Sequence, residues 1–184
     1  MKKINYLALL RGINIGGKNL VKMDFLKNIF EEMGFEDVQT YIQSGNVLFK
    51  DGEKNKIKLA KMIENKLFEK LDVQINVLIL TLNELENILN NKPATFGDEN
   101  EKYKYDIVFL IEPLTTKEVL SNIDTKRGED TISEGKNIFY ITRLTEKLSG
   151  SYLTKIIKTP MWQNITIRNL KTTKKLYELL LDRE

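Results

Sequence analysis

The sequence predicts an α+β protein of two tandem ferredoxin-like halves, each with the order β-α-β-β-α-β, an antiparallel sheet and helices packed on one face. Apolar runs typical of strands alternate with amphipathic helical patterns along the chain. In each half, two short β-rich runs adjoin across a glycine-containing turn. The segment TYIQSGNVLF at 40–49 also resembles TISEGKNIFYI at 131–141, as expected of two copies of one hairpin.

The first half is expected to occupy residues 1–80. Its first strand, INYLALL, is an apolar run that stops at a glycine-rich loop. The segment MDFLKNIFEEMG then has apolar side chains at helical spacing and ends at Gly34. Two β-rich runs joined by Ser44 and Gly45 are typical of a hairpin. The expected elements are strands 4–10, 37–43, 46–50 and 73–80, and helices 23–34 and 56–71.

Residues 81–102 are expected to link the halves through the helical pattern LNELENILNN and a polar loop with Pro93 and Gly97. The second half, 103–184, repeats the order of the first, with a hairpin around Gly135 and Lys136. Its expected elements are strands 105–111, 130–134, 137–142 and 165–168, and helices 115–123, 150–158 and 170–181.

The composition excludes several kinds of chemistry. The 184 residues are 41% hydrophobic, which suffices for a packed core, and they include no Cys and no His. Disulfides, thiolate or imidazole metal sites, a cysteine nucleophile and a histidine base are therefore excluded, and we expect no metal and no cofactor. The N-terminal segment does not resemble a leader, and no apolar run is long enough to span a bilayer. We therefore expect a cytoplasmic protein without membrane contact.

The stretch RGINIGGKN resembles a phosphate-binding loop, because Gly12, Gly17 and Lys18 have the spacing of G-x-x-x-x-G-K-[ST]. The last position is Asn19, which lacks the hydroxyl that normally contacts Mg²⁺. The next helical pattern begins several residues after Lys18, and a hairpin follows it. A nucleoside triphosphatase of this type instead builds a parallel sheet with the helix directly after the loop. The context therefore disfavours that activity.

Topology predicts where this loop lies. In a ferredoxin-like half, the end of the first strand and the tip of the hairpin share one edge of the sheet. Glycines allow close approach to a ligand, successive backbone amides can bind an anion, and Arg and Lys add positive charge. We therefore predict a site for a phosphorylated or carboxylated small molecule. Its predicted residues in this half are Arg11, Asn14, Gly16, Gly17, Lys18, Asn19, Gln43, Ser44 and Asn46.

A purely structural interpretation stays open beside this one. The glycines would then only turn the chain, Arg11 would pair with a carboxylate or a helix end, and Asn46 would close the hairpin.

Three stretches resemble a known family. LALLRGINIGGKNLVKM, VQTYIQSGNVLF and TIRNLKTTKKL look like the bacterial family called domain of unknown function 1697, over essentially the whole chain. The resemblance implies two ferredoxin-like halves and implies no activity. Leu170 departs from the family pattern, where Trp is expected. The family signature falls on Arg11, Gly12, Asn14, Gly16, Gly17, Lys18, Met23, Tyr41, Gln43, Ser44, Gly45, Asn46, Thr166, Arg168, Asn169, Thr172 and Lys175.

Arg168 and Asn169, near the end of the chain, complete the predicted ligand-binding residues. The antiparallel order places them at the opposite end of the second half from Gly135. We expect Asn169 to be the N-cap of the last helix, and Arg168 to be free to point toward the other half and contact an anion held by Lys18.

No set of polar residues forms a convincing catalytic group. A Ser44 nucleophile with Lys18 as its base would need a neutral lysine in a loop suited to anions. The first hypothesis is therefore a binding protein or a slow enzyme acting on a small anion. One alternative is nucleic-acid binding through the basic C-terminal surface with Lys171, Lys174 and Lys175, although SGNVLFK lacks the aromatic pattern of RNA-recognition modules. A protein-interaction scaffold is the other alternative.

Overall fold

The computed structural model describes residues 3–14, 20–99, 101–122, 130–151, 156 and 158–184. The chain forms two compact units. Residues 1–86 and 175–184 make up the first unit, and residues 87–174 make up the second. The expected boundaries, after residues 80 and 102, assign the last ten residues to the second half, whereas here they belong with the first sheet.

The first unit has the element order predicted from the sequence. Its sheet has the strand order β2-β3-β1-β4, and each neighbouring pair is antiparallel. The elements are β1 (Ile4–Leu10), α1 (Met23–Glu32), β2 (Glu36–Tyr41), β3 (Asn46–Asp51), α2 (Lys56–Leu71), β4 (Val77–Thr81) and α3 (Leu82–Asn90), whose last residues belong to the second unit.

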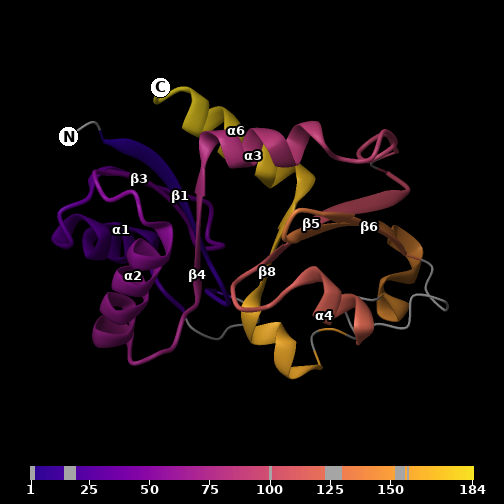
Figure 1. Cartoon of the computed structure of the whole chain (residues 1–184), viewed down its shortest axis with the longest axis horizontal. Helices are drawn as coiled ribbons and strands as arrows, with labels where there is room; N and C mark the ends of the chain where they lie inside the picture. Colours follow the sequence, from indigo (N-terminus) through magenta and orange to yellow (C-terminus); the bar gives the residue numbers. More distant parts are fainter. Residues whose placement is uncertain (1–2, 15–19, 100, 123–129, 152–155, 157) are drawn as a thin grey trace. The chain divides into compact units, whose positions relative to one another are not determined.

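One face of this sheet is covered by α1 and α2 (Figure 1). Tyr6, Ala8 and Leu10 alternate along β1 toward the helices, and all three are buried. Phe35 lies beside Phe49 of β3 with the ring centroids 4.5 Å apart. The helix-facing core is therefore continuous from the middle of β1 to its C-terminal end, where the glycine-rich loop RGINIGGKN begins.

The opposite face of the first sheet is also closed. Leu7 and Leu9 point to this face and are fully buried. At its far end, the Asn5 side chain donates a hydrogen bond of 2.9 Å to the carbonyl of Arg183. Arg183 also donates to the carbonyl of Asp37 and to the Gln39 side chain. These contacts explain why the last residues of the chain belong to the first unit.

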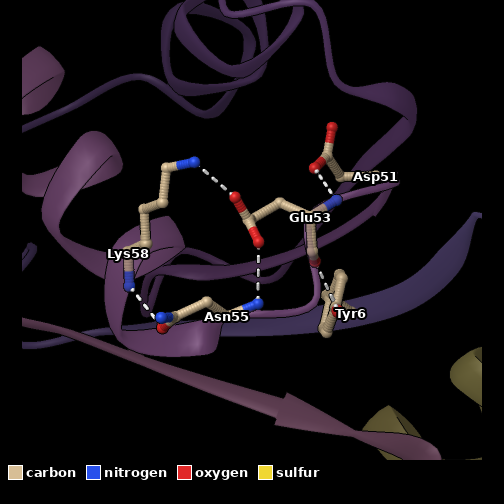
Figure 2. Close-up of polar contacts among 5 residues, drawn as sticks. All are labelled: Tyr6, Asp51, Glu53, Asn55 and Lys58. Atoms are coloured by element: carbon tan, nitrogen blue, oxygen red, sulfur yellow. Dashed lines mark hydrogen bonds and ion pairs between the residues drawn. The ribbon is translucent and has the colours of Figure 1, made fainter.

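A polar network fixes the start of α2 (Figure 2). Asn55 caps the helix by accepting from the Lys58 amide at 3.0 Å. The Glu53 carboxylate accepts from the Asn55 amide and from Lys58 Nζ, while the Glu53 carbonyl accepts from the Tyr6 hydroxyl. Burial and then the carboxylates of Asp51 and Glu53 raise the pKa of Tyr6. All of these contacts hold the helix start against β1, and their role is structural.

The second unit repeats the arrangement with the strand order β6-β7-β5-β8, again antiparallel. The tandem ferredoxin-like prediction is therefore confirmed. Its elements are β5 (Tyr103–Leu110), α4 (Thr116–Ser121), β6 (Thr131–Gly135), β7 (Ile138–Leu144), the 3-10 helices η2 (Thr145–Gly150) and η3 (Pro160–Asn164), β8 (Ile165–Asn169) and the start of α6 (Leu170–Leu181), whose residues from Lys175 on belong to the first unit. Residues 152–155 and 157 of the helix expected at 150–158 lie outside the described residues.

Aromatic side chains fill one face of the second sheet. Tyr105 of β5 and Tyr140 of β7 both pack against Phe96, with centroids 5.1 and 5.4 Å from its ring. The Tyr140 hydroxyl donates to the carbonyl of Ile88 at 2.6 Å. Both tyrosines are buried and serve the core of this unit.

Candidate functional site

The end of β1 and the β2–β3 turn meet at one edge of the first sheet, as the topology predicted. The Leu10 amide donates to the Gly45 carbonyl at 2.8 Å, and the Arg11 amide donates to the Asn76 carbonyl at 2.9 Å. Both hydrogen bonds hold residues at the very end of β1. The glycine-rich connection therefore leaves the sheet directly beside the hairpin turn. Gly16, Gly17, Lys18 and Asn19 lie outside the described residues.

Asn14 ties this connection together. Its side-chain Nδ2 donates to the Val21 carbonyl at 3.0 Å and to the Gln43 carbonyl at 3.1 Å, and its Oδ1 accepts from the Val21 amide at 2.8 Å. Asn14 adopts a φ of 55°, which Asn tolerates better than most residues. Its side chain therefore closes the connection between positions 14 and 21 and fastens it to the turn.

The turn itself is held by Asn46. This side chain is fully buried, and its Nδ2 donates to the Tyr41 carbonyl at 2.9 Å and to Ser44 Oγ at 2.8 Å. The structural interpretation of Asn46 as the residue that closes the hairpin agrees with these contacts. Ile42 has a φ of 45°, which is strained for a β-branched residue.

Gly45 permits the close contact between the turn and β1. A Cβ at this position would lie 2.9 Å from Leu10 Cβ and 3.2 Å from the Leu10 carbonyl oxygen, and the glycine φ is 70°. No larger residue fits without displacing β1. The requirement for glycine at this position is therefore steric as well as conformational.

Polar and apolar side chains surround the point where the connection after β1 meets the β2–β3 turn. Arg11 and Ser44 are partly exposed, and burial lowers the pKa of the Arg11 guanidinium. Arg11 still carries its charge at neutral pH, because guanidinium groups stay protonated in proteins. Two apolar side chains lie on the segments that Asn14 joins: Leu20 is 76% exposed and Ile42 is 48% exposed. This edge therefore presents a cation beside apolar surface.

The second unit offers an internal comparison. Its Leu110 amide donates to the Asn137 carbonyl at 3.1 Å, and its Ile111 amide donates to the Asn164 carbonyl at 2.8 Å, in the same pattern as Leu10 and Arg11. Asn137, with a φ of 57°, is thus the counterpart of Gly45 and not of Asn46. Although both hairpins carry an Asn near the turn, Asn46 and Asn137 occupy different positions in the two units.

The two remaining predicted residues lie in the second unit. Asn169 Oδ1 accepts from the Thr172 amide at 2.7 Å, which confirms the predicted N-cap of α6. In β8, Asn169 pairs with Asp106, whereas Ile165 pairs with Leu110 beside the hairpin, so Asn169 lies at the end opposite Gly135, as predicted.

Arg168 is held by its own strand. It is 7% exposed, and its Nη1 donates to Thr166 Oγ1 at 3.0 Å and to the Ile167 carbonyl at 2.7 Å. Burial lowers its pKa to about 10. Contrary to the expectation of a side chain free for a ligand, Arg168 is buried, because its register partner Ile107 faces the core.

The structure pairs two charged residues that the sequence did not single out. Arg143 of β7 donates through Nε to Asp106 Oδ2 at 2.8 Å and through Nη2 to the same oxygen. A charged residue inside the apolar run YDIVFLI was the available signal for Asp106. Its partner could not be identified from spacing, because the two strands are far apart in the chain.

The part of the chain described here contains neither a metal-binding cluster nor a membrane-spanning helix. It contains no group of three acidic, His or Cys residues that could hold a metal ion. No helix in the same ranges is long and apolar enough to cross a membrane.

Fold and site together define a protein of two ferredoxin-like units whose first sheet ends at a glycine-rich connection fastened to a hairpin turn. The family described as "Protein of unknown function (DUF1697)" matches residues 3–140, and the chain belongs to this family. This match confirms the resemblance seen in the motifs.

A solved structure supports the same fold. The chain is similar to the conserved bacterial protein SP0830 from Streptococcus pneumoniae, with a TM-score of 0.84 and 28% sequence identity. The comparison covers 97% of this chain and 99% of that chain. No curated protein matches the sequence. The names of the family and of the neighbour specify no ligand and no reaction.

Proposed function

We propose that the connection 11–22 and the turn 42–45 bind a phosphorylated or carboxylated small molecule. The observation that carries this proposal is the difference between the two units at equivalent edges of their sheets. Both edges are closed by the same pair of backbone hydrogen bonds. The second unit achieves this with residues 111–115, which include no glycine and no basic residue, whereas residues 11–22 include three glycines and three basic residues.

The fold therefore does not require the composition of the first connection. That connection is more than twice as long as its counterpart, and connections of about a dozen residues between elements of a compact unit are often functional. Arg11 offers a planar guanidinium suited to phosphate or carboxylate oxygens. Gly12 has a φ of 78°, and a Cβ added there would meet nothing within 4 Å, so this side of the glycine leaves room for a ligand.

The described residues do not favour a phosphate-loop triphosphatase. α1 begins at Met23, well after Lys18, and its N-cap Lys22 has no side-chain capping bond. The sheet is antiparallel throughout the described residues of this unit. The ligand would thus meet a backbone connection and a turn, and not the first turn of a helix.

Nucleic-acid binding and protein scaffolding stay alternatives with less support. Tyr105 and Tyr140 lie on the two central strands of the second sheet, where RNA-recognition modules display aromatics, but Phe96 covers them. The predicted basic surface has Lys171, Lys174 and Lys175, and Lys175 is paired with Glu178. The Lys175–Glu178 pair lowers the positive charge that this surface would offer to a bound single strand.

The test is ligand-induced stabilisation of the full chain by inorganic phosphate, ATP and citrate, read as a shift of the melting temperature. We expect at least one anion to raise the Tm, Lys18→Ala to abolish the shift and Lys54→Ala, which removes an exposed lysine outside the connection and the turn, to retain it. Arg11→Lys keeps the positive charge but loses the paired N–H donors of the planar guanidinium, and we expect it to weaken binding. Absence of any shift, or equal loss in both lysine variants, would show that the connection has a structural role only.

A further inference from the structure

A cavity in the second unit has the character of another anion site, separate from the connection described above. The cavity has a volume of about 400 Å³, within the range of small-ligand pockets. It lies at the end of the second sheet away from the 136–137 turn, because Lys104 pairs with Arg143 there and Asp106 pairs with Asn169. Its lining comes from β5, β7, the end of β8 and the start of α6.

Positive charge predominates in this cavity. The charged residues that line it are Lys104, Arg143 and Lys171, with Asp106 as the one carboxylate. Two positive charges are therefore left uncompensated, which matches a dianion. The acidic side chains of the preceding loop, Asp98, Glu99 and Glu101, line a different cavity.

Asp106 orients the arginine. The Nε and Nη2 atoms of Arg143 form one edge of the guanidinium, and both donate to Asp106 Oδ2. Within the described ranges these are the hydrogen bonds of this guanidinium. The second edge, with Nη1, is consequently directed away from Asp106 and is available for two parallel hydrogen bonds to an oxyanion. The ion pair is mostly buried, so its geometry is fixed before a ligand arrives.

The start of α6 adds to the positive potential. The first turn of this helix has no acidic side chain and carries Lys171 instead, although acids are favourable at that end of the helix dipole. The half-buried Tyr103 lines the same cavity. The volume exceeds that of a phosphate group alone, so an organic moiety fits beside this ring.

From these observations we propose that the cavity binds a small phosphate ester, with the phosphate between Arg143 and Lys171 and its organic group near Tyr103. Arg143 supplies two N–H donors from one edge of its guanidinium, and Asp106 holds that guanidinium in place. Lys104 and Lys171 supply positive charge.

The experiment follows the amide signals of the isotope-labelled full chain by NMR during titration with phenyl phosphate and with inorganic phosphate. The Lys18→Ala background removes the anion site proposed for the first unit. We expect both probes to shift the signals of residues 170–173, with tighter binding of phenyl phosphate. In the unmodified chain, signals at 11–14 and 42–46 report the other site independently, so the two proposals can fail separately.

Two lysines of α6 provide the matched comparison. Lys171→Ala should weaken phenyl phosphate binding about tenfold, the size of one charge-assisted hydrogen bond, whereas Lys174→Ala, exposed on the same helix but outside the cavity lining, should leave the affinity unchanged. Arg143→Lys should also weaken binding. If residues 170–173 show no shift, or if both lysine variants weaken binding equally, the cavity is not a phosphate site. The comparison of the two lysine variants still tests the proposal if the arginine variant does not fold.

Discussion

Replacing Gly45 by alanine tests the closeness of the turn to β1. The added Cβ would lie 2.9 Å from Leu10 Cβ and 3.2 Å from the Leu10 carbonyl oxygen. A left-handed backbone costs a non-glycine residue about 1–2 kcal/mol, and overpacking against a fixed strand adds about 1–3 kcal/mol. We therefore expect Gly45→Ala to lower the free energy of unfolding by about 2–5 kcal/mol.

Two other glycines separate these contributions. Gly34 has a φ of 83° with nothing within 4 Å of its would-be Cβ, so Gly34→Ala should lose only the conformational part, about 1–2 kcal/mol. Gly52 has neither a positive φ nor a close neighbour, so Gly52→Ala should be neutral or slightly stabilising.

The assay is urea unfolding of the full-length variants followed by far-ultraviolet circular dichroism. The expected order of destabilisation is Gly45 first, Gly34 second and Gly52 last. If Gly45→Ala were no more destabilising than Gly34→Ala, the close approach of the turn to Leu10 would be refuted. The convergence on which the proposed site depends would then lose its support.

Three further predictions concern stability. Asn169→Ala removes the N-cap of α6 and should lower the free energy of unfolding by about 1 kcal/mol, without changing anion affinity at the first-unit connection; an unchanged urea midpoint would contradict the cap. Burial alone would raise the pKa of Glu84, but hydrogen bonds from Lys56 and the Thr81 amide outweigh it and lower the pKa. Glu84 therefore stabilises the fold above its ordinary pKa of 4.5, and this contribution should disappear as the pH falls through the lower folded value; unfolding of Glu84→Gln measured across this range should show a weaker pH dependence. Asp106→Asn leaves the Arg143 cation buried without its counter-charge and should cost about 3 kcal/mol, whereas a small loss in urea unfolding would show that water solvates the arginine.

Periodicity was sufficient for most of the fold. The strand at 4–10 and the helices at 56–71 and 170–181 have the predicted bounds, because a clear apolar pattern coincides with a stop or cap signal such as Asn55. The strand expected to begin at Val73 begins at Val77. There the Val77 amide donates to the Glu64 side chain, a contact between α2 and β4 that no local pattern reveals.

The meeting of the connection with the hairpin turn was predictable from the sequence, but the contacts within it were not. Strand order alone places Arg11 beside the hairpin turn. The tie formed by Asn14, the burial of Arg168 and the pairing of Asp106 with Arg143 all depend on contacts between residues distant in the chain. Residue type and spacing do not determine such contacts, so candidate ligand residues and structural residues looked alike in the sequence.

The return of the last ten residues to the first unit has a consequence for synthesis. The second unit, 87–174, is synthesised as one uninterrupted segment. The first unit is complete only after Arg183 has been added to the chain and can accept the hydrogen bond from Asn5. Until then, Asn5 of β1 lacks the hydrogen bonds that it donates to Arg183 and Glu184. The nascent first unit is thus incomplete for the time needed to translate about half of the chain, and the second unit can fold before the first is complete.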